Sequence, residues 1–172
     1  IHVRDGAFAY IHDSQIVDMR EEPMSGCQNG VGIFVGYSRY ETDVAQKLPA
    51  HALVVRNTVD AYQKAGILAG GFGTTVALLE NDIHGVGKTS KLAQNGIQIV
   101  HAAGIIEGND VSMNLCDYFD VARKEQQNCG PDPSKHIQAG GVVIVGPEKN
   151  VLIRDNRVQS NDAGLLVVSS SE

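Results

Sequence analysis

The sequence contains no tryptophan and few other aromatic residues, five Tyr and four Phe among 172 residues. A core anchored on large aromatic rings is therefore not expected. Acidic residues outnumber basic ones by 20 to 14, and the resulting net charge of −6 argues against a general electrostatic attraction to nucleic acid or anionic lipid. No apolar run approaches the roughly 20 residues that a membrane span requires, so we expect no membrane span.

Cysteine is also scarce, with three residues and neither a Cys-x-x-Cys motif nor a Cys/His spacing typical of zinc sites. Cys116 and Cys129 are spaced to close a ring of about 14 residues, which favours a disulfide over zinc. Cys27 has no obvious partner and is expected to be free. Because disulfides form in oxidising compartments, we expect a secreted, periplasmic or cell-surface protein. The first residues include neither an initiator Met nor an apolar signal segment, as expected of a mature fragment.

Two short motifs alternate along the whole chain. One is a small polar residue, any residue and then Val or Ile; the other is Gly followed by an aliphatic residue. The first motif begins at Ser14, Asn57, Asn81, Asn109 and Asn156, and the second at Gly32, Gly66, Gly96, Gly141 and Gly164. The shortest steps between them give a unit of about 21 residues, so the longer steps indicate loop insertions. The segments around the motifs are short, aliphatic and alternating, which is typical of strands.

A unit of three short strands cannot bury its apolar face alone and must stack on copies of itself. The repeat therefore predicts an all-β fold, a right-handed parallel β-helix of about five coils that occupies residues 1–172 as a single domain of a longer chain. A β-sandwich is the alternative. It requires two-residue hairpin turns, and Asn29-Gly30 and Asn95-Gly96 are not placed for such turns.

Segments such as 93–100 and 150–158 resemble the right-handed parallel β-helix repeat of the pectate-lyase-like superfamily, in particular its bacterial secreted members. The resemblance implies that Asn57, Asn81, Asn109 and Asn156, with Ser14 at the weaker end, form a hydrogen-bonded ladder at a turn of each coil. It also implies that the strand opening with Gly-Ile carries the substrate face. The outward residues of that strand in successive coils are Phe34, Leu68, Gln98, Val143 and Leu166. This nearly apolar column lacks the calcium-binding aspartates and the basic catalytic residue of the family. We therefore identify no metal-ligand cluster and no cofactor, although the resemblance leaves calcium open.

Most of the extra length is expected in four insertions, residues 18–31, 37–50, 84–95 and 112–140. The insertions 18–31, 84–95 and 112–140 are expected to leave the same corner of the coil and to wall one side of the first-strand face, with 37–50 across from them. Such loops build a binding surface or cover an exposed apolar sheet.

The candidate acid–base residues are His84, Lys135, His136 and Asp60. Asp60 and His84 occupy equivalent positions in successive coils, so they form either an acid–base pair or an ordinary surface hydrogen bond. Candidate sugar-contacting residues are Phe34, Tyr37, Tyr40, Tyr62, Gln98, His101 and Asp132. The aromatic members offer a stacking platform for sugar rings, or else fix the 37–50 insertion against the sheet. Segment 82–89 ends like a phosphate-binding loop, but it lacks the first Gly and a following helix, so nucleotide binding is not expected.

Two functions remain open. The first is a polysaccharide-binding or polysaccharide-processing module of the lyase, epimerase or hydrolase type. The second is a non-catalytic structural, adhesin-like or oligomerisation domain. In either case we expect further coils, a capping segment or a homo-oligomer partner, because an uncapped solenoid end exposes unpaired strand edges.

Overall fold

The computed structural model describes residues 1–38, 47–117, 139–147 and 150–169. Within these residues the regular structure consists of strands alone, and they form three sheets. No helix long and apolar enough to cross a membrane occurs in the part of the chain described.

Each sheet takes every third strand of the chain. The first sheet contains β1 (His2–Val3), β4 (Val31–Gly36), β7 (Ala65–Gly70), β10 (Asn95–Val100), β13 (Gly140–Val145) and β16 (Ala163–Val168). The second contains β2 (Phe8–His12), β5 (His51–Val55), β8 (Thr75–Leu79), β11 (Ala103–Glu107) and β14 (Val151–Arg154). The third contains β3 (Gln15–Val17), β6 (Thr58–Tyr62), β9 (Asp82–Thr89), β12 (Asp110–Cys116) and β15 (Arg157–Gln159).

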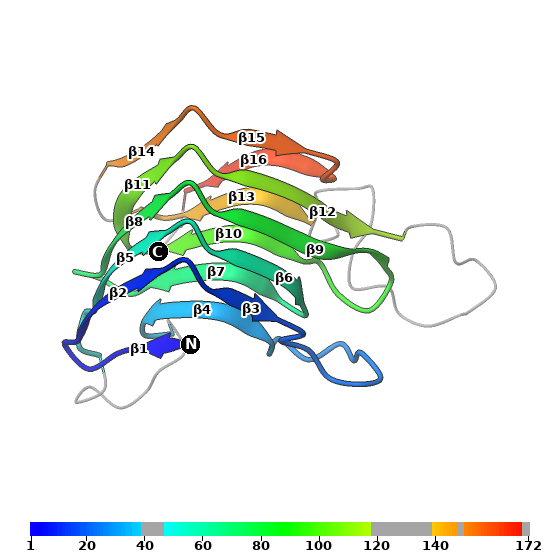
Figure 1. Ribbon diagram of the computed structural model, residues 1–172, viewed down its shortest axis with the longest axis horizontal. Helices are drawn as coiled ribbons and strands as arrows, with labels where there is room; N and C mark the ends of the chain where they lie inside the picture. Colours follow the sequence, from blue (N-terminus) through cyan, green and yellow to red (C-terminus); the bar gives the residue numbers. More distant parts are fainter. Residues whose placement is uncertain (39–46, 118–138, 148–149, 170–172) are drawn as a thin grey trace.

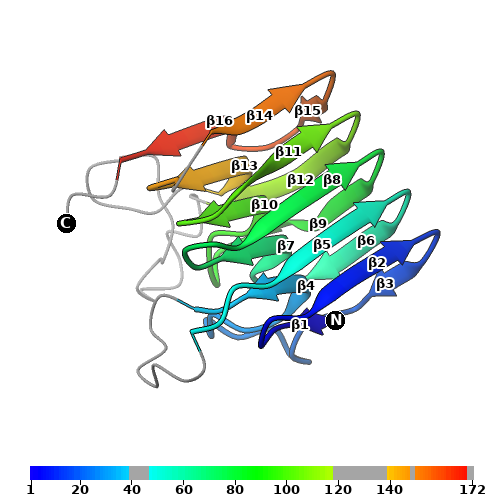
Figure 2. The same cartoon turned by 90° about the vertical axis from the view of Figure 1, so that its left-hand side faces the viewer.

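All neighbouring strands pair in parallel, one coil with the next. The second sheet shows this order most clearly in Figure 2, where its strands run from blue to orange along the stack. The Gly-aliphatic motifs align across the first sheet, with Ile33 opposite Ile67 and Ile67 opposite Ile97. The predicted right-handed parallel β-helix of about five coils is therefore confirmed, and the sandwich alternative is excluded.

Aliphatic side chains from all three sheets fill the interior of the solenoid. In the central coil, Ile97, Ile106 and Val111 point inward from β10, β11 and β12, and all are fully buried. Because alternate residues of a strand face opposite sides of a sheet, the residues between them face outward. The core is thus a stack of similar apolar layers, one for each coil.

The predicted asparagine ladder lies at the sharp bend between the second and third sheets, which forms the aligned row of peaks in Figure 1. Asn57 donates through Nδ2 to Asn81 Oδ1 at 3.0 Å, and Asn81 donates in the same way to Asn109 at 2.9 Å. Asn109 in turn donates to Asn156 at 2.9 Å, and the backbone N–H of Ser14 donates to Asn57 at 3.1 Å. The ladder satisfies buried polar groups at a point where the sheets are interrupted.

The residue before each ladder asparagine turns the chain. Arg56, Glu80 and Asp155 have φ values of 51°, 55° and 55°, in the left-handed region that non-glycine residues seldom occupy. Gly108 has a φ of 67° at the same position. Repetition of this conformation keeps the bends of successive coils in line.

One feature of the third sheet differs from the sequence-based expectation. Residues 84–95 and 112–140 are predicted as loops, yet β9 continues to Thr89 and β12 continues to Cys116. A bulge in the register between Ser112 and Asn114 precedes the continuation of β12 beside β9. The extended ends of β9 and β12 project beyond β6 in Figure 1.

Candidate functional site

The outer face of the first sheet carries a groove of about 800 Å³. The predicted outward column lines it, because each member is the register partner of the next. These residues are Phe34, Leu68, Gln98, Val143 and Leu166. Gln28 and Asn29, from the predicted 18–31 insertion, also line the groove. That insertion therefore contributes to a wall of the groove, as expected.

Asn95 and Gln98 form a fixed amide pair within the groove. Asn95 is 4% exposed, and its Nδ2 donates to Gln98 Oε1 at 3.0 Å. Asn95 Oδ1 is shielded from solvent and has no hydrogen-bond partner among the described residues. Gln98 Oε1 accepts the hydrogen bond from Asn95, so the NH2 group of Gln98 is the part of the amide that can donate to a ligand.

Lys64 brings a basic group to the groove from the residue directly before β7. Its Nζ donates to the carbonyl oxygen of Ala93 at 3.1 Å. Burial lowers the pKa of Lys64 to about 8, because the charged ammonium loses part of its hydration. The side chain is still a cation at neutral pH, and it can act as a base at mildly alkaline pH.

Two aromatic residues line the groove. Phe34 stacks on His2, with ring centroids 4.6 Å apart and an interplanar angle of 7°. Tyr37 Oη donates to the carbonyl oxygen of Phe72 at 3.4 Å. The Tyr37 ring packs over Gly71, where a Cβ atom would lie 2.4 Å from it, so a glycine is required.

Two other predicted sugar-contacting residues lie elsewhere. Tyr62 is fully buried, and its hydroxyl donates to Asn114 Oδ1 at 2.6 Å, so the prediction that its ring faces a sugar is wrong. His101 lies in the turn after β10 with a φ of 52° and stacks on Phe72 with centroids 4.9 Å apart. It is outside the set of groove-lining residues, so Gln98 and His101 do not share the groove floor.

Asp60 and His84 are register partners, as predicted, but they lie on the third sheet. His84 Nε2 is 2.9 Å from Asp82 Oδ1 on its own strand, so the ion pair of His84 is with Asp82. His84 is held by β9 and does not belong to a loop beside the first sheet. The structure therefore does not place Asp60 and His84 beside the groove.

Tyr40, Asp132, Lys135 and His136 lie outside the described residues, as does Cys129, and their predicted roles stay predictions. Cys27 is free and exposed, as expected, whereas Cys116 is buried.

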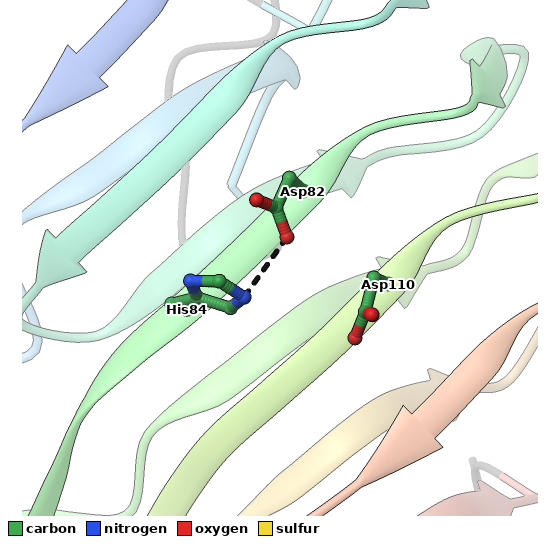
Figure 3. A group of neighbouring side chains, drawn as sticks. All are labelled: Asp82, His84 and Asp110. Atoms are coloured by element: carbon green, nitrogen blue, oxygen red, sulfur yellow. Dashed lines mark ion pairs between the residues drawn. The ribbon is translucent and has the colours of Figure 1, made fainter.

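Figure 3 shows a second polar cluster, which the sequence analysis missed. Asp82, His84 and Asp110 offer ligand atoms that all lie within 4.8 Å of one another on the outer face of the third sheet. The signal was present in the sequence, because Asp82 and Asp110 each follow a ladder asparagine directly. The shared position after Asn81 and Asn109 makes them register partners.

Comparison with known proteins gives no match to a family model, to a curated protein or to a solved structure.

Proposed function

We propose that the groove on the first sheet binds a polysaccharide and that this domain is a polysaccharide-binding or polysaccharide-processing β-helix module of the pectate-lyase-like type. The observation that carries the proposal is the groove itself. It combines an apolar floor, the rings of Phe34 and Tyr37, and the donors of Gln98 and Lys64. Sugars present apolar ring faces and many hydroxyl groups, which match aromatic surfaces and fixed amides.

The direction of the groove also supports a polymer ligand. The outward column runs across five strands of the first sheet, from Phe34 to Leu166. Neighbouring strands are about 4.8 Å apart, so the column offers an extended row of contacts suited to several consecutive sugar units. The cationic Lys64 favours a chain that carries carboxylates, such as a uronate polymer.

The test is a binding titration with neutral and uronate oligosaccharides, comparing two Gln→Ala variants. We expect Gln98→Ala to weaken binding at least tenfold because it removes a donor in the groove. Gln159→Ala, on exposed β15 of the third sheet, is the matched control and should bind as the wild type does. Lys64→Met should weaken the binding of uronate oligosaccharides more than that of neutral ones.

Turnover is tested with the same polymers. Unsaturated-product absorbance reports a lyase, and new reducing ends report a hydrolase, with and without added calcium. Absence of binding across the panel at millimolar ligand, or equal weakening by Gln98→Ala and Gln159→Ala, would refute the proposal.

A different observation favours the non-catalytic alternative, in which the domain associates with a second copy of itself. Register partners on the outer face of the second sheet form an apolar stripe of Tyr10, Leu53, Ala77, Ile105 and Leu152. Tyr10, Ile105 and Leu152 are 54%, 39% and 47% exposed. Continuous exposed apolar surface is typical of association sites.

Sedimentation of the wild type and two Lys variants tests this alternative. Ile105→Lys should dissociate an oligomer that forms through the stripe. Met113→Lys, at an exposed apolar residue of the third sheet, should leave it intact. A monomeric wild type would remove the support for this alternative.

A further inference from the structure

We propose that Asp82, His84 and Asp110 form a binding site for a divalent transition-metal ion such as Zn²⁺ on the outer face of the third sheet. The site lies on a different sheet from the groove, and the inference is independent of polysaccharide binding.

The backbone holds the three side chains on two paired strands. Asp82 and His84 are alternate residues of β9 and face the same side, and Asp110 on β12 is the register partner of Asp82. The ligand atoms all lie within 4.8 Å of one another. Donors around one tetrahedral ion are about 3.4 Å apart, given bond lengths of roughly 2.1 Å. Binding of an ion would therefore require the side chains to rotate so that the largest separation shortens by up to about 1.4 Å.

The side chains have room for that rotation. Those of Asp82, His84 and Asp110 are 51%, 38% and 34% exposed, so each side chain is partly open to solvent. Figure 3 shows Asp82 and His84 directed toward one another, with Asp110 alongside on the next strand. His84 Nε2 is already 2.9 Å from Asp82 Oδ1, so two of the donors face a common point.

One oxygen of the cluster lacks a protein partner. Asp110 Oδ1 is shielded from solvent and accepts no hydrogen bond among the described residues. The nearby cation, Arg157, approaches the other oxygen, with its guanidinium nitrogen 3.6 Å from Oδ2. A shielded carboxylate oxygen without a donor is costly in a folded protein, and a metal ion would supply the missing partner.

The surrounding charge also favours a cation. Asp60, on the strand on the other side of β9, is the register partner of His84, so a third carboxylate lies on the neighbouring strand. Arg157 is the opposing charge from β15, and its contact with Asp110 is longer than a hydrogen bond. The local balance is negative even with this arginine included.

The donor set selects the class of ion. Calcium takes six to eight oxygen ligands, whereas this cluster offers one imidazole nitrogen with carboxylate oxygens. Mixed nitrogen and oxygen donors suit Zn²⁺ and its transition-metal neighbours. Water would complete the coordination, as it does where a protein supplies three ligands.

The experiment is calorimetric titration of the protein with Zn²⁺ in a Cys27→Ser background, so that the free thiol cannot serve as the ligand. We expect one ion per chain at this site. Both His84→Ala and Asp110→Asn should weaken binding at least tenfold. Both positions are partly exposed, and an unchanged far-ultraviolet circular dichroism spectrum will show that the variants fold.

The matched control is His12→Ala. His12 and Asp13 form another exposed His–Asp pair, 2.8 Å apart, that lies outside the cluster. This variant should bind Zn²⁺ as the background protein does. Titration with Co²⁺ gives a second readout, since nitrogen and oxygen ligation changes its visible absorption and His84→Ala should abolish that change.

Absence of Zn²⁺ binding at millimolar concentration would overturn the proposal. So would binding that is unchanged in both His84→Ala and Asp110→Asn, because the ion would then sit elsewhere. A preference for Ca²⁺ over Zn²⁺ that is lost in Asp110→Asn would overturn the assignment of a transition metal.

Discussion

The inner coils and the last coil carry the same pattern with very different burial. Val35, Ile99, Ile144 and Val167 belong to one inward-facing row of the first sheet. The first three are at most 2% exposed, whereas Val167 is 62% exposed. β16 is the edge strand of the described sheet, so one of its sides has no neighbour there. The repeat thus determines which way a side chain points, and the adjacent coil determines whether it is buried.

The asparagine ladder shows the same contrast. Asn57, Asn81 and Asn109 are each 1% exposed, but Asn156 in the last coil is only partly buried. Its side chain makes the same kinds of hydrogen bond as the others. Because burial differs between the inner coils and the last coil, equivalent substitutions should differ in their cost in unfolding free energy.

The largest difference is expected for Asn→Ala in the ladder. Asn81→Ala removes the partners of the Asn57 backbone N–H and of the Val54 carbonyl oxygen inside the core. Two buried groups without partners should lower the free energy of unfolding by about 4 kcal/mol. Asn156→Ala should cost about half as much, since water reaches the groups it leaves. Urea denaturation measures both, and equal losses would break the comparison.

A smaller difference is expected for Val→Ala within one row. Val35→Ala removes buried methyl groups between β1 and β7 and should cost about 2 kcal/mol. Val167→Ala, in the same row at the edge strand, should cost under about 0.5 kcal/mol. A loss above 1 kcal/mol at Val167 in thermal unfolding would show that something covers the last coil in solution.

A third expected effect concerns a charge on an inner coil. The folded-state pKa of Lys64 is lowered from 10.5 to about 8, so between these pH values the unfolded chain holds a proton that the folded chain has lost. The free energy of unfolding therefore rises with pH across this window. Below pH 8 the cost of burying the charged ammonium does not change with pH. Lys64→Met should be more stable than the wild type at pH 7 and should lack this rise.

Denaturation at several pH values from 7 to 10.5 measures the effect. The exposed Lys88→Met variant serves as the control and should keep the slope of the wild type. A Lys64→Met variant that keeps the wild-type slope would show that Lys64 is hydrated in the folded protein.

Sequence reasoning succeeded where the repeat is regular. Coil order, parallel pairing and the outward column of the first sheet follow from the two alternating motifs, whereas the hydrogen-bonded asparagine ladder is implied by the resemblance to the pectate-lyase-like repeat. The first three depend on a two-residue alternation within strands and on alignment between coils, both of which spacing reveals.

Sequence reasoning failed where the alternation of inward and outward residues along a strand is broken. Strict alternation from Val59 places Tyr62 on the outside, but the register shifts after Asp60 and Ala61 adopts a φ of 55°. That bulge turns Tyr62 into the core. A signal did exist, since Tyr62, Asn114 and Asn161 each follow a ladder asparagine by five residues. Asn114 and Asn161 form a second stacked pair, with Nδ2 to Oδ1 at 2.8 Å.

Lys64 and the metal-site candidates were missed for another reason. The burial of Lys64 depends on whether the preceding segment covers its side chain. The spacing of the two motifs carries no information about this. Asp82 and Asp110 were not predicted as a site, although the parallel pairing of β9 and β12 brings them together.

The ladder contacts have a consequence for how such a protein can change. The chain takes 28 residues from Asn81 to Asn109 and 47 from Asn109 to Asn156, yet both contacts measure 2.9 Å. Closing the loop of 47 residues costs only about 0.5 kcal/mol more in chain entropy than closing the loop of 28 residues. Evolution can therefore insert new segments at the bends between strands, where they can contact new ligands, while each apolar layer of the interior keeps its position.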